Sequence, residues 1–175
     1  MLCKKLHHCA YRCADARQTV DFYTDVLDLK FSHAVGGDHV PSTGQYDPHI
    51  HVFFEMEDGS SIAFFEVPNG PGGVKDEVMP DWIQHFAFEV DTLETLERAK
   101  AELVARGVSV VGPTDHGFIC SIYFHDPSGH RLELTTRTAG PEVLESFAAD
   151  APHLLELWEK TKDWSLVGQA KGLHG

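Results

Sequence analysis

The chain has 175 residues, 42% hydrophobic and 10% aromatic, which suits one domain with a substantial core. Its formal charge of −13, from 27 acidic and 14 basic side chains, argues against a nucleic acid or an anionic membrane as partner. No apolar run has the length of a membrane span or a secretory leader, and the four cysteines lack the spacing of a zinc site or a disulfide framework. We therefore expect a cytoplasmic protein.

The first half of the chain predicts one helix followed by a run of strands. Strand-like alternation covers Leu6–Cys13. Asp15 and Gln18 then have the spacing of a capping box for a helix that ends near Leu29. Asp58-Gly59 marks a hairpin turn between the last two strands. Three strands are expected after the helix, at 29–35, 49–56 and 61–67.

The second half repeats this order after a Gly- and Pro-rich linker at 68–80. A strand at 83–90 leads to Asp91 or Thr92 as a helix cap, and Gly107 ends that helix. Because the first strand of each half carries a histidine at the same place, the chain reads as two βαβββ units. Three strands complete the second unit, at 108–111, 120–124 and 131–135.

The composition changes after Gly140, where Pro141 and Pro152 each have the position of a first helical residue. Two short amphipathic helices are expected there, at 142–148 and 153–162. We thus predict an α+β fold: residues 1–139 form a single metal-binding domain of two βαβββ modules in a curved, cupped sheet, and residues 140–175 form a C-terminal helical extension. The modules are expected at about 4–68 and 81–138.

Strand alternation predicts which side chains share the concave side of the sheet. Side chains of a strand point to opposite faces in turn, and the more apolar faces should pack under the helices. This places His8, His85, Glu133 and Tyr123 in one cleft. A lone histidine on a strand is ordinarily a surface or hydrogen-bonded residue, but equivalent placement in two repeats favours a ligand role. Two imidazoles and one carboxylate form the facial triad that suits non-haem Fe(II).

The motifs LHHCAYRCADARQTVDFYTDVLDLKF, IQHFAFEV and YFHDPSGHRLEL resemble the vicinal oxygen chelate superfamily, which includes glyoxalases, extradiol dioxygenases, fosfomycin-resistance enzymes and bleomycin-binding proteins. The resemblance covers about residues 4–137. It implies paired βαβββ modules around one divalent metal. The family's ligands match His8, His85 and Glu133. Fe(II) is the expected ion, with Mn(II) as the alternative.

The second module is closest in motif to type I extradiol ring-cleavage dioxygenases. Their signature is similar to Thr114-Asp115-His116, Ile122-Tyr123, the turn at 126–129 and then Glu133. The resemblance implies that Tyr123 acts on a metal-bound substrate oxygen and that His116 positions the substrate. Such enzymes also carry a histidine near the start of the last strand of the first module, where this chain has residues 59–61, Gly-Ser-Ser.

On this resemblance the chain is expected to be an Fe(II)-dependent extradiol-type dioxygenase that uses O2 on a catechol-like aromatic diol. His51 is the candidate for acid/base work in place of the missing histidine, His49 for substrate contact, and Arg12 for an acidic substrate tail. A homodimer is expected, in which the modules pair either within one chain or by exchange between chains.

Two alternatives stay open. A metal-dependent lyase or isomerase of glyoxalase type needs no O2, but it ordinarily takes a fourth ligand, Glu or Gln, where this chain has Ala63. Glu66 lies nearby on the opposite face of that strand. A non-enzymatic binding protein is the other alternative, although relatives of that kind generally lack the metal ligands that this chain retains.

Overall fold

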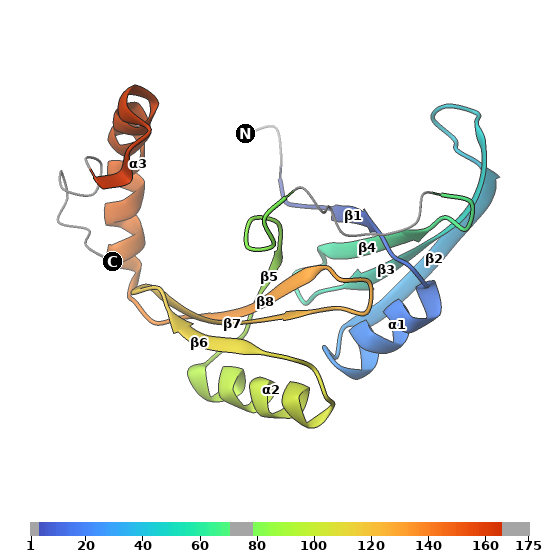
Figure 1. Ribbon diagram of the computed structural model, residues 1–175, viewed down its shortest axis with the longest axis horizontal. Helices are drawn as coiled ribbons and strands as arrows, with labels where there is room; N and C mark the ends of the chain where they lie inside the picture. The colour runs from blue at the N-terminus through green and yellow to red at the C-terminus, as the bar shows by residue number, and fades with distance from the viewer. Residues whose placement is uncertain (1–3, 71–78, 166–175) are drawn as a thin grey trace.

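The computed structural model describes residues 4–70 and 79–165. The described elements form two four-stranded mixed sheets and three helices (Figure 1). In chain order they are β1 (His8–Arg12), α1 (Ala16–Asp25), β2 (Lys30–His39), β3 (Tyr46–Glu55), β4 (Ser61–Glu66), β5 (Phe86–Glu89), α2 (Leu93–Ala105), β6 (Val111–Asp115), β7 (Ile119–His125), β8 (Arg131–Arg137) and α3 (Pro141–Thr161). This confirms the predicted α+β fold with two βαβββ modules.

The two modules have the same topology. Strand order is β1-β4-β3-β2 in the first sheet and β5-β8-β7-β6 in the second. The first strand of each module runs parallel to the last, and the other pairs are antiparallel. Ala10 pairs with Ala63 in the first module, and Ala87 pairs with Glu133 in the second. This register makes Ala63 the counterpart of Glu133.

Each module helix begins at a side-chain cap, as the sequence predicts. The Asp15 carboxylate accepts a hydrogen bond from Gln18 N at 2.8 Å, which satisfies one free donor of α1. The Thr92 hydroxyl accepts one from Thr95 N at 3.1 Å at the start of α2. Glu66, on the last strand of the first module, accepts a further bond from the N–H of α1's first residue at 2.6 Å.

Both helices pack beneath the sheets, on the side away from the N-terminus in Figure 1. Tyr23 of α1 is fully buried, stacks on Phe54 and contacts the tilted ring of Phe64. Its hydroxyl donates a hydrogen bond to Asp126, in the β7–β8 turn, at 3.1 Å. Because buried residues of both modules form one apolar cluster, the two modules share a core.

Some boundaries differ from those predicted. The strand expected at 108–111 begins only at Val111, because Val108 N still donates to Leu103 O at the end of α2, at 3.0 Å. β2 continues beyond residue 35 through Gly36, where any Cβ would meet His49 O at 2.8 Å, so a glycine permits the strands' close approach.

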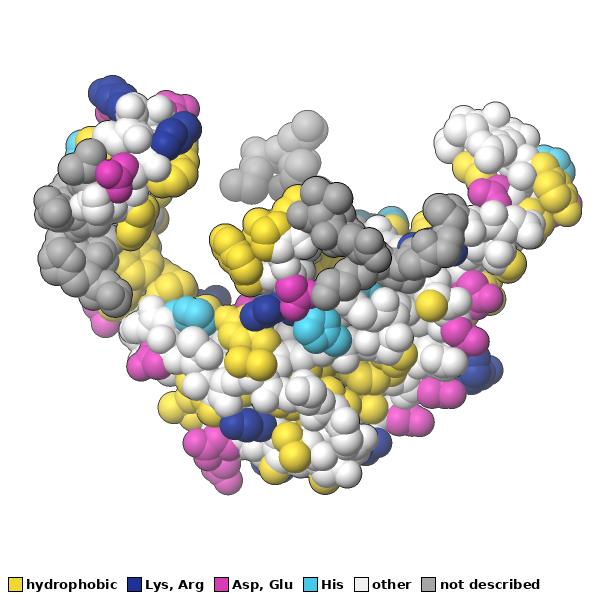
Figure 2. Space-filling view, in the orientation of Figure 1, with side chains coloured by type: hydrophobic (Ala, Val, Ile, Leu, Met, Phe, Trp, Pro, Cys, Tyr) yellow, Lys and Arg dark blue, Asp and Glu magenta, His cyan; other side chains and the backbone are white. Residues whose placement is uncertain are grey.

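The C-terminal segment is helical as predicted, but it is one helix and not two. Pro152 lies inside α3. A proline inside a helix removes one backbone donor and crowds the carbonyl four residues earlier, yet α3 continues through Pro152. No residue of α3 is buried, and Leu155 and Trp158 are exposed. In Figure 2, α3 projects at one end of the molecule and the β2–β3 hairpin at the other, and hydrophobic side chains line the inner side of α3.

None of the helices within residues 4–70 and 79–165 is long and apolar enough to cross a membrane. Cys9, Cys13 and Cys120 are free thiols, and Cys3 lies outside the described residues.

Candidate metal centre

Two of the predicted metal ligands lie side by side. Glu133, on β8, is only 4% exposed, and His85 directly precedes β5, the parallel neighbour of β8. His85 Nε2 and Glu133 Oε2 are 3.0 Å apart. Two ligands at adjacent positions around an ion, each about 2.1 Å from it, would be separated by about 3 Å. The pair therefore fits a divalent ion.

A phenol and a third imidazole extend this pair. Tyr123 lies directly across from Glu133 on the antiparallel neighbour β7, and its hydroxyl donates to Glu133 Oε1 at 3.4 Å. His116, in the turn between β6 and β7, is hydrogen bonded through Nε2 to the Tyr123 hydroxyl at 2.8 Å. Burial raises the pKa of Tyr123, and the Glu133 carboxylate raises it further. The phenol is therefore protonated at neutral pH and available as a donor.

His8 lies with a different set of side chains. Its Nδ1 is 2.8 Å from Nδ1 of His7, and its ring contacts His51 and Phe53, with centroids 6.0 and 5.4 Å away. Among the described residues of one chain, no three His, Cys, Asp or Glu side chains are grouped so as to hold a metal ion. A single chain thus brings together His85 and Glu133, but not His8 with them.

The ring of His51 contacts that of His8, so the two side chains lie on the same face of the first sheet. Strand alternation alone does not determine whether His51 faces the concave side. Its ring stacks on Phe65 with centroids 3.5 Å apart, and His49 contacts the same ring from 5.6 Å. His51 is 6% exposed, and its buried Nε2 has no hydrogen-bond partner among the described residues. Burial, together with neighbouring imidazoles including His8, lowers the pKa of His51 to about 4.

Arg12 lies at the end of β1, where its guanidinium donates to the backbone oxygen of Val67 at 3.4 Å. Glu66 is engaged at the N-terminus of α1, which leaves Ala63 where a glyoxalase-type fourth ligand would stand.

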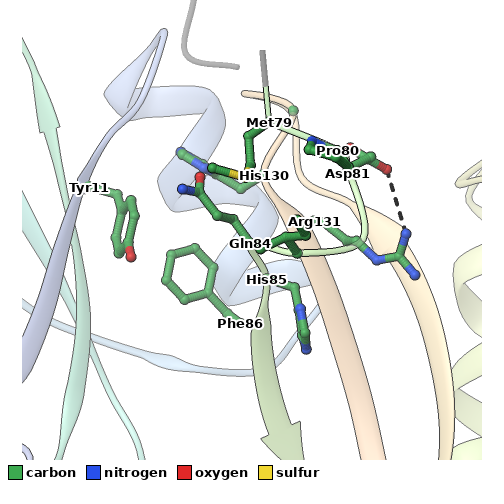
Figure 3. Close-up of a pocket in the computed structure, with 11 residues that line it drawn as sticks. Tyr11, Met79, Pro80, Asp81, Gln84, His85, Phe86, His130 and Arg131 are labelled. Atoms are coloured by element: carbon green, nitrogen blue, oxygen red, sulfur yellow. Dashed lines mark ion pairs between the residues drawn. The ribbon is translucent and has the colours of Figure 1, made fainter. Parts of the chain in front are cut away.

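A cavity of about 220 Å³ adjoins the His85 side of the site (Figure 3). Arg131 lies two residues before Glu133 on β8 and therefore shares its face, but no motif in the sequence indicates a role for it. In the structure Arg131 lines the cavity and its guanidinium carbon lies 4.5 Å from the centre of the Tyr123 ring. The residues that line the cavity are Tyr11, Met79, Pro80, Asp81, Ile83, Gln84, His85, Phe86, Gly129, His130 and Arg131.

Comparison with known proteins agrees with this architecture. The profile of the Glyoxalase/Bleomycin resistance protein/Dioxygenase superfamily matches residues 5–134. The metallothiol transferase FosB of Bacillus licheniformis is 28% identical over 151 residues, which are 85% of each chain.

Solved structures show the same fold. A glyoxylase/bleomycin resistance protein/dioxygenase domain from Frankia sp. EAN1pec superposes with a TM-score of 0.64 at 22% identity, over 80% of this chain and 96% of that one. A mutant of the fosfomycin resistance protein FosX from Listeria monocytogenes, complexed with Mn(II) and 1S,2S-dihydroxypropylphosphonic acid, superposes with a TM-score of 0.57 at 20% identity, over 81% and 97%.

Proposed function

Since the chain belongs to the glyoxalase/bleomycin resistance protein/dioxygenase superfamily, we propose that it is a divalent-metal enzyme, and specifically an Fe(II)-dependent extradiol-type dioxygenase acting on a catechol-like aromatic diol. The observation that carries the proposal is the continuous line of contacts from His116 through Tyr123 and Glu133 to His85. It sets a phenol and an imidazole beside two candidate ligands, as the extradiol resemblance implies.

In this proposal His8, His85 and Glu133 hold the ion. A bound divalent ion supplies Lewis acidity, which lowers the pKa of a coordinating diol hydroxyl. Tyr123 then donates a hydrogen bond to a substrate oxygen, and His116 orients the phenol and can exchange a proton with it. His51, whose Nε2 is unpaired in the described structure, is the proposed acid/base group. Substrate contacts from His49 and Arg12 stay predictions.

The separation of His8 from His85 and Glu133 supports the dimeric alternative. We propose that the partner subunit's His8 completes each His85–Glu133 pair, with the exposed side chains of α3 adding to the contact between subunits. Mixing His8→Ala and Glu133→Ala chains tests this, because exchanged sites regain one complete ligand set per mixed dimer. Metal binding that returns on mixing supports exchange, and metal binding that stays absent favours a site within one chain.

The reaction is tested by loading the protein with Fe(II) under argon and then adding O2 with a panel of catechols in an oxygen electrode. The dioxygenase proposal expects O2 uptake that requires both Fe(II) and a vicinal diol. Turnover that persists under argon would overturn it.

The similarity to FosB favours one second candidate, a metal-dependent transferase of thiols. The same protein, kept under argon and loaded with Mn(II) or Zn(II), would then consume a thiol together with an electrophilic substrate, without any use of O2. A lyase or isomerase of glyoxalase type would also work under argon, but without net thiol consumption.

A further inference from the structure

Arg131 is held beside the metal centre in a way that the proposed chemistry does not use. It stands two residues before Glu133 on β8, so both side chains lie on the same face of the strand. Its side chain is 21% exposed and lines the same cavity as His85. Its Nε is buried and makes no hydrogen bond to any described residue. A buried donor on a cation that lacks a hydrogen-bond partner carries a cost in free energy, so the guanidinium is incompletely satisfied within the described structure.

Besides the Tyr123 ring, the Arg131 guanidinium has a carboxylate partner, Asp81, and their contact is long. Asp81 Oδ2 lies 3.6 Å from Arg131 Nη1, longer than the 2.7–2.9 Å typical of a charge-assisted hydrogen bond. The Asp81 carboxylate is closer to His125, at 3.0 and 3.2 Å from Nε2. Figure 3 shows Asp81 and Arg131 facing each other at the cavity wall. The Asp81 side chain, 38% exposed, thus stands where another carboxylate could make a better contact.

The rest of the cavity wall is suited to a small ring. Tyr11, Ile83 and Phe86 present apolar surface, and Tyr11 and Phe86 meet edge to face with centroids 4.6 Å apart. Arg131 is the one Arg or Lys among the described lining residues. In a chain of net charge −13, a single positive group beside apolar surface selects for one anionic group and not for several.

We propose that the substrate is a ring-bearing carboxylic acid whose carboxylate binds the Arg131 guanidinium in place of Asp81, while its vicinal oxygens face the metal centre. This inference rests on the proposed function for the vicinal oxygens only. A planar guanidinium pairs with a carboxylate through two parallel hydrogen bonds, so Arg131 determines specificity for the acid and takes no part as a metal ligand.

Binding calorimetry under argon tests the proposal with 3,4-dihydroxybenzoate and its methyl ester. The two probes share the diol and differ in the carboxylate. With the Fe(II)-loaded protein the acid should bind about 10- to 100-fold more tightly than the ester, as expected for a hydrogen bond to a charged group. The preference should persist in metal-free protein, at lower affinity, because Arg131 is not a ligand.

Three variants locate the effect. Arg131→Gln should remove the preference for the acid, and Arg131→Lys should keep part of it. Asp81→Asn should strengthen binding of the acid several-fold without affecting the ester, because the competing carboxylate is gone. Arg137→Gln is the matched control: it removes the same charge from β8, at a side chain that is 62% exposed and paired with Glu89. Its preference should equal that of the wild type.

Equal binding of acid and ester by the wild type, an equal loss of both in Arg131→Gln, or failure of the acid to bind at all would overturn the proposal. If the preference for the acid depends on Arg131 but the protein takes up no O2, the carboxylate site is supported and the dioxygenase proposal is wrong.

Discussion

The two modules share one backbone plan but differ in the chemistry that they carry. The strand registers pair Tyr123 with Glu133 in the second module and Phe53 with Ala63 in the first. The phenol and carboxylate of one module are therefore replaced by a phenyl ring and a methyl group in the other. The first module carries imidazoles on this face instead, where His51 stacks on Phe65 and contacts the tilted ring of Phe53. At this matched pair of positions only the second module therefore carries a phenol and a carboxylate, while imidazoles lie in both halves.

The turns that join the last two strands of each module differ in the same way. Met56 N donates to Ser60 O and Asp126 N donates to His130 O, at 2.9 and 3.0 Å, so the two turns share their backbone bonding. Asp126 differs from Met56 in carrying a buried carboxylate, which also reaches Tyr23 of the first module. The two modules therefore share their backbone bonding. The side chains at matched positions differ, and they place the candidate metal ligand Glu133, the donor Tyr123 and the inter-module contact of Asp126 in the second module.

The largest effect is expected from removing the carboxylate that only the second module has. Glu133→Ala should weaken metal binding by more than about 100-fold, because losing an outer partner of a ligand already costs about 10- to 100-fold. Metal analysis after dialysis measures this. Glu89→Ala, an exposed carboxylate on the neighbouring strand, is the control and should leave the metal in place. If Glu133→Ala retained its full metal content, Glu133 would not be a metal ligand and the proposed site would be wrong.

The second largest effect is expected from removing the Tyr123 hydroxyl. Tyr123→Phe should lower turnover by about 10²- to 10⁴-fold while metal content stays unchanged, because in the proposed mechanism the hydroxyl donates to a substrate oxygen and is not a ligand. Tyr46→Phe makes the same chemical change at an exposed position at the start of β3, outside the cavity wall, and should be nearly silent. A smaller loss in Tyr123→Phe would indicate that the phenol only positions the substrate.

Local patterns in the sequence were sufficient for the fold and for part of the site. Strand alternation placed Tyr123 and Glu133 on one face, and the turn between them fixed their register, so their contact followed from short-range rules. His116, which the sequence indicated only through the family resemblance, lies beside them because the β6–β7 turn is short. The capping pattern at Asp15 predicted the start of α1 in the same way.

The remaining features depend on long-range packing, which alternation does not encode. The separation of His8 from His85 depends on how two modules of one chain dock. The role of Arg131 depends on Asp81, 50 residues earlier in the chain. The Arg12 guanidinium points to Val67, since a long flexible side chain can reach a backbone acceptor that no strand pattern specifies.

A smaller effect, on the pH dependence of stability, is expected at Asp126, which accepts a hydrogen bond from Tyr23 of the other module. Burial raises the pKa of Asp126 above its ordinary value. The folded state therefore holds a proton that the unfolded state has already released, and this contribution to stability falls as pH rises from the ordinary carboxyl pKa, about 4, through the raised value. Asp126→Asn keeps an acceptor for Ser128 N and His130 N, which Asp126 Oδ1 binds at 2.9 Å each.

Urea unfolding of the wild type and Asp126→Asn, measured at steps from pH 4 to 7, reports the titration of Asp126, because groups that do not interact with it contribute equally to both proteins. His130, whose charge lowers the pKa of Asp126, is present in both. The variant should gain stability relative to the wild type as pH rises. A difference that does not change with pH would show that Asp126 titrates in the folded state as it does in the unfolded chain.

The smallest effect is expected at the two helix caps, where the modules are most alike. Asp15→Ala and Thr92→Ala each remove one acceptor for a free N–H, which costs about 1 kcal/mol of unfolding free energy. After Asp15→Ala, the N-terminus of α1 still has the Glu66 carboxylate as an acceptor. The position that corresponds to Glu66 in the second module is Thr136. The loss should therefore be smaller at Asp15 than at Thr92. Urea unfolding at neutral pH measures both.

Two further variants decide whether Glu66 causes that difference. Adding Glu66→Gln to Asp15→Ala should increase the loss at α1 beyond the sum of the single changes, because each group compensates for the absence of the other at the same helix end. Asp15→Asn retains a capping oxygen and should remain near wild type. Strictly additive losses would mean that Glu66 does not compensate for the missing Asp15 cap. Removing the cap should then cost the same unfolding free energy at α1 as at α2.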